Sequence, residues 1–411
     1  MLFGQGTSLI LQAFSSGIAQ VPVLIAIALI IIIGYISRYL FGKTKIPEIL
    51  ILITIGVILV PVGNLLPSSY VAVLRSLAPI FGDIALIIIM FNGGRQIRLE
   101  KGFGSSKGIT LGILDTIVSA IALSLLMNVI FGWPFIYGAL LGTILGETAV
   151  VVVIPIIKRI RLKQEIYDLL VMETTTNSVV SILVFTLLLS MLTGDPFTVQ
   201  SFATYSVDYL SVAITSGLLV GIGWLFAQRE MKSAREYLAT LAVAILLFGV
   251  VSLFNGAAIV AVLVFALITG NSKLISKTLR MKITARNQEI TEARVTERDL
   301  EFLIRTFFFV FIGMIASLSL TYLYYAVIVT VILIILRYLQ VKVVLKNKRE
   351  FQTLVFTLFP RGTVAAVLGA ILFGMSIAYS SKIFYIVFIV IVLTNVLAGI
   401  LLTRVRFKIR Q

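Results

Sequence analysis

The chain has 411 residues, of which 59% are hydrophobic and only 13% are charged, and this composition excludes a soluble domain with one apolar core beneath a charged surface. It contains no cysteine and no histidine, which excludes a disulfide framework, thiolate metal sites and His-dependent hydrolysis and leaves proton handling to carboxylates. We therefore expect a non-enzyme without cofactor or resident metal. The net charge of +16 would suggest nucleic-acid binding in a soluble protein. In a membrane protein, the distribution of the basic residues between loops instead indicates orientation.

Apolar stretches recur almost without pause from Val21 to Val405. A bilayer core about 30 Å thick takes roughly 20 residues of helix. The sequence thus predicts an all-α membrane protein of about 13 transmembrane helices, forming a single transporter domain over residues 1–411. The expected spans lie at about residues 21–40, 46–63, 74–94, 108–131, 134–157, 165–192, 204–227, 237–254, 256–271, 299–319, 321–344, 351–375 and 382–404.

Lysine and arginine are concentrated in alternate loops. One side of the membrane has only Arg75 and Lys382. The other side holds the basic residues within 38–45, 95–107, 158–163, 229–235, 273–298, 342–349 and 404–410. By the positive-inside rule the C-terminus is cytoplasmic and the N-terminus lies outside, in a multi-pass plasma-membrane protein.

Several charged residues fall inside predicted spans. A charge at mid-bilayer costs at least about 2.5 to 3.5 kcal/mol on insertion scales, so each is expected to be paired or to line an aqueous path. Asp208 lies nearer an outer end. The residues within spans are Asp83, Asp115, Glu147, Glu173, Arg305, Arg337 and Arg361.

The depth of each charged residue in the membrane, estimated from its position along a helix, limits which residues can form ion pairs. Glu173 falls roughly 12 Å, and Arg337 roughly 10 Å, from the cytoplasmic edge, so these two residues can meet. Arg305 has a similar depth and is the rival partner of Glu173. Glu147 and Arg361 both fall near the midplane. For Asp115 and Arg305 the favoured alternative is a satisfied polar contact at a helix end.

A faint internal repeat relates the two parts of the chain. GETAVVVVIP in the fifth span answers RGTVAAVLGA in the twelfth, and about thirty residues after each, TNSVVSIL answers TNVLAGIL. The offset is seven spans, an odd number, so the copies face opposite ways, as in secondary transporters with inverted repeats. Two crossed discontinuous helices are therefore expected at spans 5 and 12; close helix packing is the alternative role of their small residues. The residues where unwinding is expected are Gly142, Gly146 and Thr148, and Pro360, Gly362 and Thr363.

These motifs, in this order, make the sequence resemble the cation/proton antiporter superfamily, the membrane domain of bacterial and archaeal sodium/proton and potassium/proton exchangers. The motifs are DIALIIIMFNGG, GETAVVVVIP, ETTTN, RTFFFVFIGM, the isolated Arg337 and FPRGTVAAVLGA. The resemblance implies a homodimer whose scaffold comprises about residues 21–94 and 204–319, and a mobile core of about residues 108–192 and 321–404. It also implies that Glu173 and Arg337 form a core ion pair.

The chain departs from the family pattern at both usual aspartates. Ser178 follows Asn177, and Thr148 is followed by alanine and valine where relatives often have Thr-Asp-Pro. Glu147 is the carboxylate left at the break and is the favoured proton and cation carrier, with Glu173, Asp83 and Asp115 as alternatives. The expected cation ligands are oxygens of Glu147, Thr148, Asn177 and Ser178.

The mechanism expected from these features is alternating access, in which a carboxylate binds either a proton or a monovalent cation, Na⁺ or K⁺. Two other classes stay open. A sodium-coupled organic-anion symporter would use Arg361 to bind a substrate carboxylate. A regulatory relative that had lost transport would also explain the missing aspartates.

Overall fold

The computed structural model describes most of the chain as helix. The described residues are 28–40, 48–63, 68–97, 105–149, 153, 164–193, 199–228, 236–254, 256–278, 289–346, 348–375 and 377–404. All regular elements within these ranges are helical, which confirms the all-α class. They are a helix over Ala28–Leu40, then α3 (Glu48–Val57), η1 (Ile58–Val62), α4 (Ser68–Gln96), α5 (Ser106–Phe131), α6 (Phe135–Leu145), α8 (Gln164–Thr193), α9 (Val199–Gln228), α10 (Glu236–Leu253), α11 (Ala258–Gly270), α12 (Ser272–Thr278), α13 (Glu289–Ile315), α14 (Leu320–Val344), α15 (Arg349–Thr357), α16 (Thr363–Gly374) and α17 (Ser380–Arg404).

Each predicted span overlaps one helix or two consecutive helices, although parts of the spans at 21–40, 46–63 and 134–157 lie outside the described residues. By length and hydropathy five helices of the described chain are sufficient to cross a bilayer, namely α5, α8, α9, α14 and α17. The pair α11 and α12, bent by 75°, makes a sixth if it counts as one span. The chain is thus a multi-pass membrane protein, and the number thirteen stays a prediction.

The two ends of α5 show how local sequence sets the bounds of this helix and its turn into α6. Ser105 caps its N-terminus by accepting a hydrogen bond from the Gly108 N–H at 3.3 Å. At the other end Gly132 has a left-handed φ of 66°, and its N–H bonds to the Asn128 carbonyl. Pro134 then precedes α6. The tight turn makes α5 and α6 antiparallel neighbours.

Glycines on α6 bring its backbone against α5. A Cβ on Gly142 would lie 2.2 Å from the carbonyl oxygen of Ser119, and one on Gly146 would lie 2.6 Å from the Cα of Thr116. Gly138 and Gly142 lie four residues apart on one face of α6, and Gly146 follows at the same spacing directly after the helix. Close packing is therefore one role of Gly142 and Gly146, and it fixes the end of α6 beside the middle of α5.

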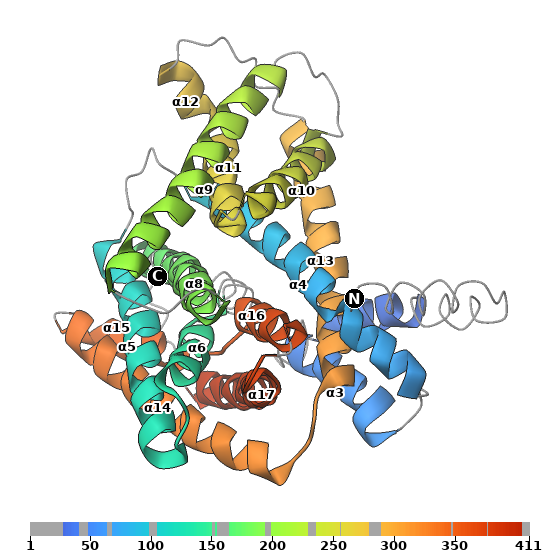
Figure 1. Ribbon diagram of the computed structural model, residues 1–411, viewed down its shortest axis with the longest axis vertical. Helices are drawn as coiled ribbons and strands as arrows, with labels where there is room; N and C mark the ends of the chain where they lie inside the picture. The colour runs from blue at the N-terminus through green and yellow to red at the C-terminus, as the bar shows by residue number, and fades with distance from the viewer. Residues whose placement is uncertain are drawn as a thin grey trace.

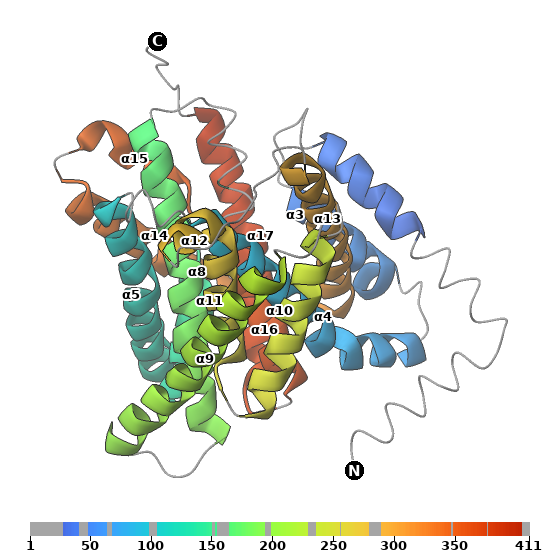
Figure 2. The same ribbon diagram turned by 90° about the horizontal axis from the view of Figure 1, so that it is seen from above.

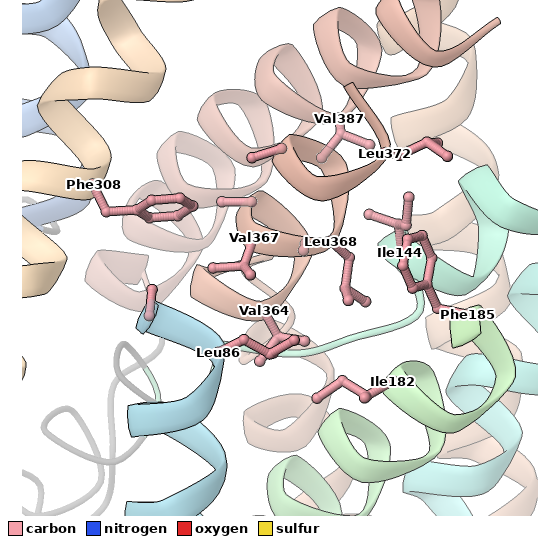
Figure 3. Packing of buried hydrophobic residues seen from close by; sticks show 14 of the residues in the cluster. Leu86, Ile144, Ile182, Phe185, Phe308, Val364, Val367, Leu368, Leu372 and Val387 are labelled. Carbon is pink, nitrogen blue, oxygen red and sulfur yellow. The ribbon is translucent and has the colours of Figure 1, made fainter. Parts of the chain in front are cut away.

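Helix α16 lies at the centre of the molecule. In Figure 1, α5, α6, α8, α14, α15 and α17 gather on one side of it, and α4 and α13 lie on the other. Figure 2 likewise separates α5, α14 and α15 from α3 and α13. Figure 3 shows Val364 and Leu368 of α16 among side chains of α4, α6 and α8, with Phe308 of α13 on the opposite side. Tight packing of this helix positions the polar segment that precedes it.

Candidate ion-binding site

Two predicted spans contain a non-helical segment, and the two segments contact each other. Helix α6 ends at Leu145, and residues 146–149 are not helical; we call this segment the first break. Helix α15 ends at Thr357 and α16 begins at Thr363; residues 358–362 form the second break. The Ala149 N–H donates to the Pro360 carbonyl at 2.8 Å.

The contact between the breaks leaves no room for a side chain at Gly362. A Cβ there would lie 2.3 Å from the Cβ of Ala149. The Gly362 N–H donates to Oε2 of Glu147 at 3.3 Å. The carboxylate of Glu147 thus lies at the N-terminus of α16, where free N–H groups and the helix dipole favour negative charge.

Arg361, in the second break, is 1% exposed. Its Nη1 donates to the backbone carbonyl of Glu147 at 2.8 Å and to Oγ1 of Thr148 at 3.4 Å. The two residues expected near the midplane are therefore neighbours. The guanidinium contacts the backbone of Glu147, whereas the glutamate carboxylate contacts the start of α16.

Helix α17 holds the second break in place. Oγ1 of Thr394 accepts a hydrogen bond from the Arg361 N–H at 3.1 Å. Nδ2 of Asn395 donates to the Arg361 carbonyl and to the Ile391 carbonyl, both at 2.8 Å. The sequence identified this Thr-Asn pair as part of the repeat but not as a support for the break. Its fixed distance from each break could have indicated that role.

A second group of charges surrounds Arg337 of α14, which is buried. Its guanidinium forms ion pairs with Glu173 of α8 and with Asp115 of α5, the latter at 2.8 Å, and donates to the Val355 carbonyl of α15 at 2.9 Å. The structure brings Glu173 and Arg337 together, and it adds a partner that depth along the helices did not identify. One guanidinium is shared by two carboxylates.

The expected contact at a helix end is found for Arg305 but not for Asp115. Asp115 lies in the middle of α5 and is 1% exposed, so the expected contact at a helix end is wrong for it. Arg305 of α13 pairs with Glu48, in the first turn of α3, at 3.1 Å. The rival pairing of Arg305 with Glu173 is therefore wrong, because equal depth does not mean that two helices are adjacent.

Two further candidates lie apart from the buried charges. Asp83 is half-buried on α4, next to Gly82, which packs toward Ile371 of α16. Asp208 is exposed on α9. The structure does not bring either side chain into the contacts made by Glu147, Glu173 or Asp115.

Asn177 and Ser178 follow Glu173 on α8 and are both buried. Asn177 lies four residues after Glu173, so the two side chains share a face of the helix. Neither Nδ2 nor Oδ1 of Asn177 has a hydrogen-bond partner. Ser178 donates to the Thr174 carbonyl at 2.9 Å, and its side chain lies near the carboxylate of Glu147. A buried amide without partners is unusual and suits a site that receives a polar ligand.

The charged side chains that are buried in the described part of the chain do not cancel. They are Asp115, Glu147, Glu173, Arg337 and Arg361. When all five groups are ionised, three carboxylates against two guanidiniums leave one negative charge unmatched. Because an unmatched charge is costly in low dielectric, one proton or one monovalent cation would complete the balance.

The fold and site together define a polytopic all-helical membrane protein with charged residues buried at two facing helix breaks. The family described as sodium/hydrogen exchanger, transmembrane, matches residues 25–408, and the chain belongs to this family.

Sequence relatives include two named antiporters. The K⁺/H⁺ antiporter NhaP of Alkalimonas amylolytica is 25% identical over 260 residues, which cover 61% of this chain and 44% of that protein. Na⁺/H⁺ antiporter 1 of Methanocaldococcus jannaschii is 26% identical over 225 residues, covering 52% and 50%. The match thus spans about half the length of each relative.

The same fold is found in a solved structure. That of the sodium proton antiporter MjNhaP1 from Methanocaldococcus jannaschii at pH 8 matches with a TM-score of 0.74 at 21% identity, covering 93% of this chain and 98% of that one.

Proposed function

We propose that this protein exchanges a monovalent cation, Na⁺ or K⁺, for protons across a membrane by alternating access. The observation that carries the proposal is the unmatched negative charge among the five buried charged residues. A proton and an alkali ion have the same charge, so either one balances the site and both together would overbalance it. Competition for a single unit of charge couples the two movements.

Glu147 is the proposed carrier. Its carboxylate lies at the N-terminus of α16 and beside the Ser178 hydroxyl, at the facing breaks. Oxygens of Thr148, Asn177 and Ser178 complete the proposed cation ligands, a set that suits a hard alkali ion. The free amide of Asn177 supports this assignment.

The proposed architecture extends the described helices to thirteen spans. The two breaks belong to crossed discontinuous helices of an inverted repeat. Spans at about 108–192 and 321–404 form a moving core, and those at about 21–94 and 204–319 form a scaffold through which two copies associate as a homodimer. The distribution of loop charges supports an orientation with the N-terminus outside, and the proposed location is the plasma membrane.

An organic-anion symporter would need Arg361 for a substrate carboxylate. The contacts of that guanidinium with the Glu147 carbonyl and the Thr148 hydroxyl favour a role in holding the first break instead. Proton-independent uptake would favour the symporter, and absence of any transport would favour a regulatory relative.

The test is proton movement in everted vesicles, followed by dequenching of a pH-sensitive dye as Na⁺, K⁺ or Li⁺ is added. Wild-type protein is expected to respond to at least one cation. Glu147→Gln keeps size and hydrogen-bonding reach but cannot titrate, so cation-driven proton movement should be abolished while the protein still folds. Glu165→Gln changes a glutamate that is 59% exposed and should exchange like wild type.

A double mutant that moves the carboxylate from position 147 to position 178 gives a second test. Ser178→Asp combined with Glu147→Gln places a carboxylate at the position following Asn177 and should restore part of the exchange. A Glu147→Gln protein that exchanges at the wild-type rate would exclude Glu147 as the carrier.

A further inference from the structure

Asp115 of α5 links the two groups of polar residues at the site. Its Oδ2 accepts a hydrogen bond from Nη1 of Arg337 at 2.8 Å and lies 3.5 Å from Oγ1 of Thr148, which donates to it. Thr148 belongs to the first break, and its hydroxyl also accepts from Arg361. Asp115 is thus the carboxylate that joins the Arg337 cluster to the first break.

The residues around Asp115 pack on the part of α8 that carries Asn177. A Cβ on Gly112 would lie 2.9 Å from the Asn177 nitrogen, and Oγ1 of Thr116 is 3.4 Å from the Asn177 carbonyl. Both contacts are made by the backbone of α8 at the residue whose amide group has no partner. The Asp115 carboxylate and the Thr148 hydroxyl therefore meet close to the stretch of α8 that carries Asn177, whose side-chain amide has no partner.

The sharing of Arg337 makes one carboxylate available. If a single carboxylate were paired with Arg337, binding a cation to it would leave a buried guanidinium without a counter-charge, which is strongly unfavourable. Here Glu173 continues to pair with Arg337 when Asp115 turns to another cation. Two carboxylates on one guanidinium thus permit one of them to exchange partners.

We propose that Asp115 is a carboxylate ligand of the transported cation, acting with Thr148 and Asn177 in place of the aspartates absent at positions 149 and 178. This inference rests on the proposed exchange function. The cation is an alkali ion, since carboxylate oxygens of Asp115 and Glu147 together with neutral hydroxyl and amide oxygens suit a hard ion.

The test compares Asp115→Asn with Asp208→Asn, a matched change on the exposed face of α9. Purified protein is heated in detergent with increasing NaCl, KCl or LiCl, with choline chloride as the control for ionic strength. Because a ligand that binds the native state raises the melting temperature, wild type and Asp208→Asn should be stabilised by the transported cation. Asp115→Asn should require at least about tenfold more cation for the same shift, the effect of losing a charged ligand.

Exchange in vesicles gives the second measurement. The cation concentration for half-maximal exchange should rise by at least about tenfold in Asp115→Asn. Unchanged cation dependence in both assays would overturn the assignment of Asp115 while wild-type exchange kept the proposed function intact. Absence of exchange and of cation-specific stabilisation in wild type would refute the proposed function itself.

Asp115→Glu covers the case in which the asparagine variant does not fold. It keeps the charge beside Arg337 but moves the carboxylate oxygens by one methylene. A ligand displaced in this way should alter the preference among Na⁺, K⁺ and Li⁺ in the melting assay. An unchanged preference and affinity in a folded Asp115→Glu protein would show that the cation does not contact residue 115.

Discussion

The two breaks are similar in backbone but differ in how their polar groups are satisfied. Each is a non-helical segment directly after a helix, and each is followed about thirty residues later by a Thr-Asn pair on a long helix. In the second break Thr394 and Asn395 both bond to the backbone of Arg361. The matched Asn177, near the first break, has an amide without partners.

This difference indicates that the polar side chains near the second break support its backbone, whereas those near the first break are suited to bind an ion. The second break is held by Oγ1 of Thr394 and Nδ2 of Asn395, which bond to its backbone, so these two groups are occupied, whereas Oδ1 of Asn395 has no hydrogen-bond partner. The first break contributes a carboxylate and lies beside an asparagine whose amide makes no internal hydrogen bond. Duplicated architecture thus provides the paired breaks, and divergence of the contacts makes the first one suitable for an ion.

The largest expected effect comes from removing the link between the two halves. Arg337 joins Asp115 and Glu173, which precede and follow the first break, to Val355 of α15, before the second. Arg337→Ala strands two buried carboxylates and should lower stability by about 3 to 5 kcal/mol. Glu173→Ala should cost less, because Asp115 still pairs with the guanidinium.

Melting in detergent measures both variants and the double mutant. Since Arg337 and Glu173 contact each other, the double mutant should lose less than the sum of the single losses. Additive losses would contradict the pairing, and equal losses in the two single mutants would contradict the sharing of Arg337 with Asp115.

A smaller effect is expected from separating the breaks sterically. Gly362→Ala would place a Cβ 2.3 Å from that of Ala149, and overpacking of this kind typically costs about 1 to 3 kcal/mol. Gly399→Ala on α17 is the matched control, since nothing lies within 4 Å of its added Cβ and alanine is the better helix former. If both variants melt like wild type, close contact between the breaks is not required for stability.

Hydropathy and turn residues predict much of the fold, because lipid imposes length and apolarity on each span independently. The second break lies where Pro360 and Gly362 indicate it. By contrast, α13 begins at Glu289, about ten residues before the expected span. Its charged first turns form helix without being apolar, so hydropathy does not detect them.

The candidate site was only partly predictable. Depth along a helix indicated that Glu173 and Arg337 can meet, since rise per residue is fixed. Which way a side chain faces, and which helix is its neighbour, depend on tertiary packing. The role of Asp115 beside Arg337 and the pairing of Arg305 with Glu48, 257 residues away in sequence, therefore required the structure.

The smallest change tests the comparison most directly, by making the same substitution at the two matched asparagines. Asn395→Ala removes the hydrogen bonds to the carbonyls of Arg361 and Ile391, which should cost about 1 to 2 kcal/mol and lower the melting temperature. Asn177→Ala removes no hydrogen bond made by the side chain. Both residues are fully buried, so the cavity left by truncation is of the same kind, and the difference in stability between the variants reports the hydrogen bonds.

Exchange should show the opposite order: Asn177→Ala should need about tenfold more cation for half-maximal activity, whereas Asn395→Ala should keep the wild-type cation dependence. If Asn177→Ala loses as much stability as Asn395→Ala and its cation dependence does not change, the two breaks are equivalent supports and the ion binds elsewhere.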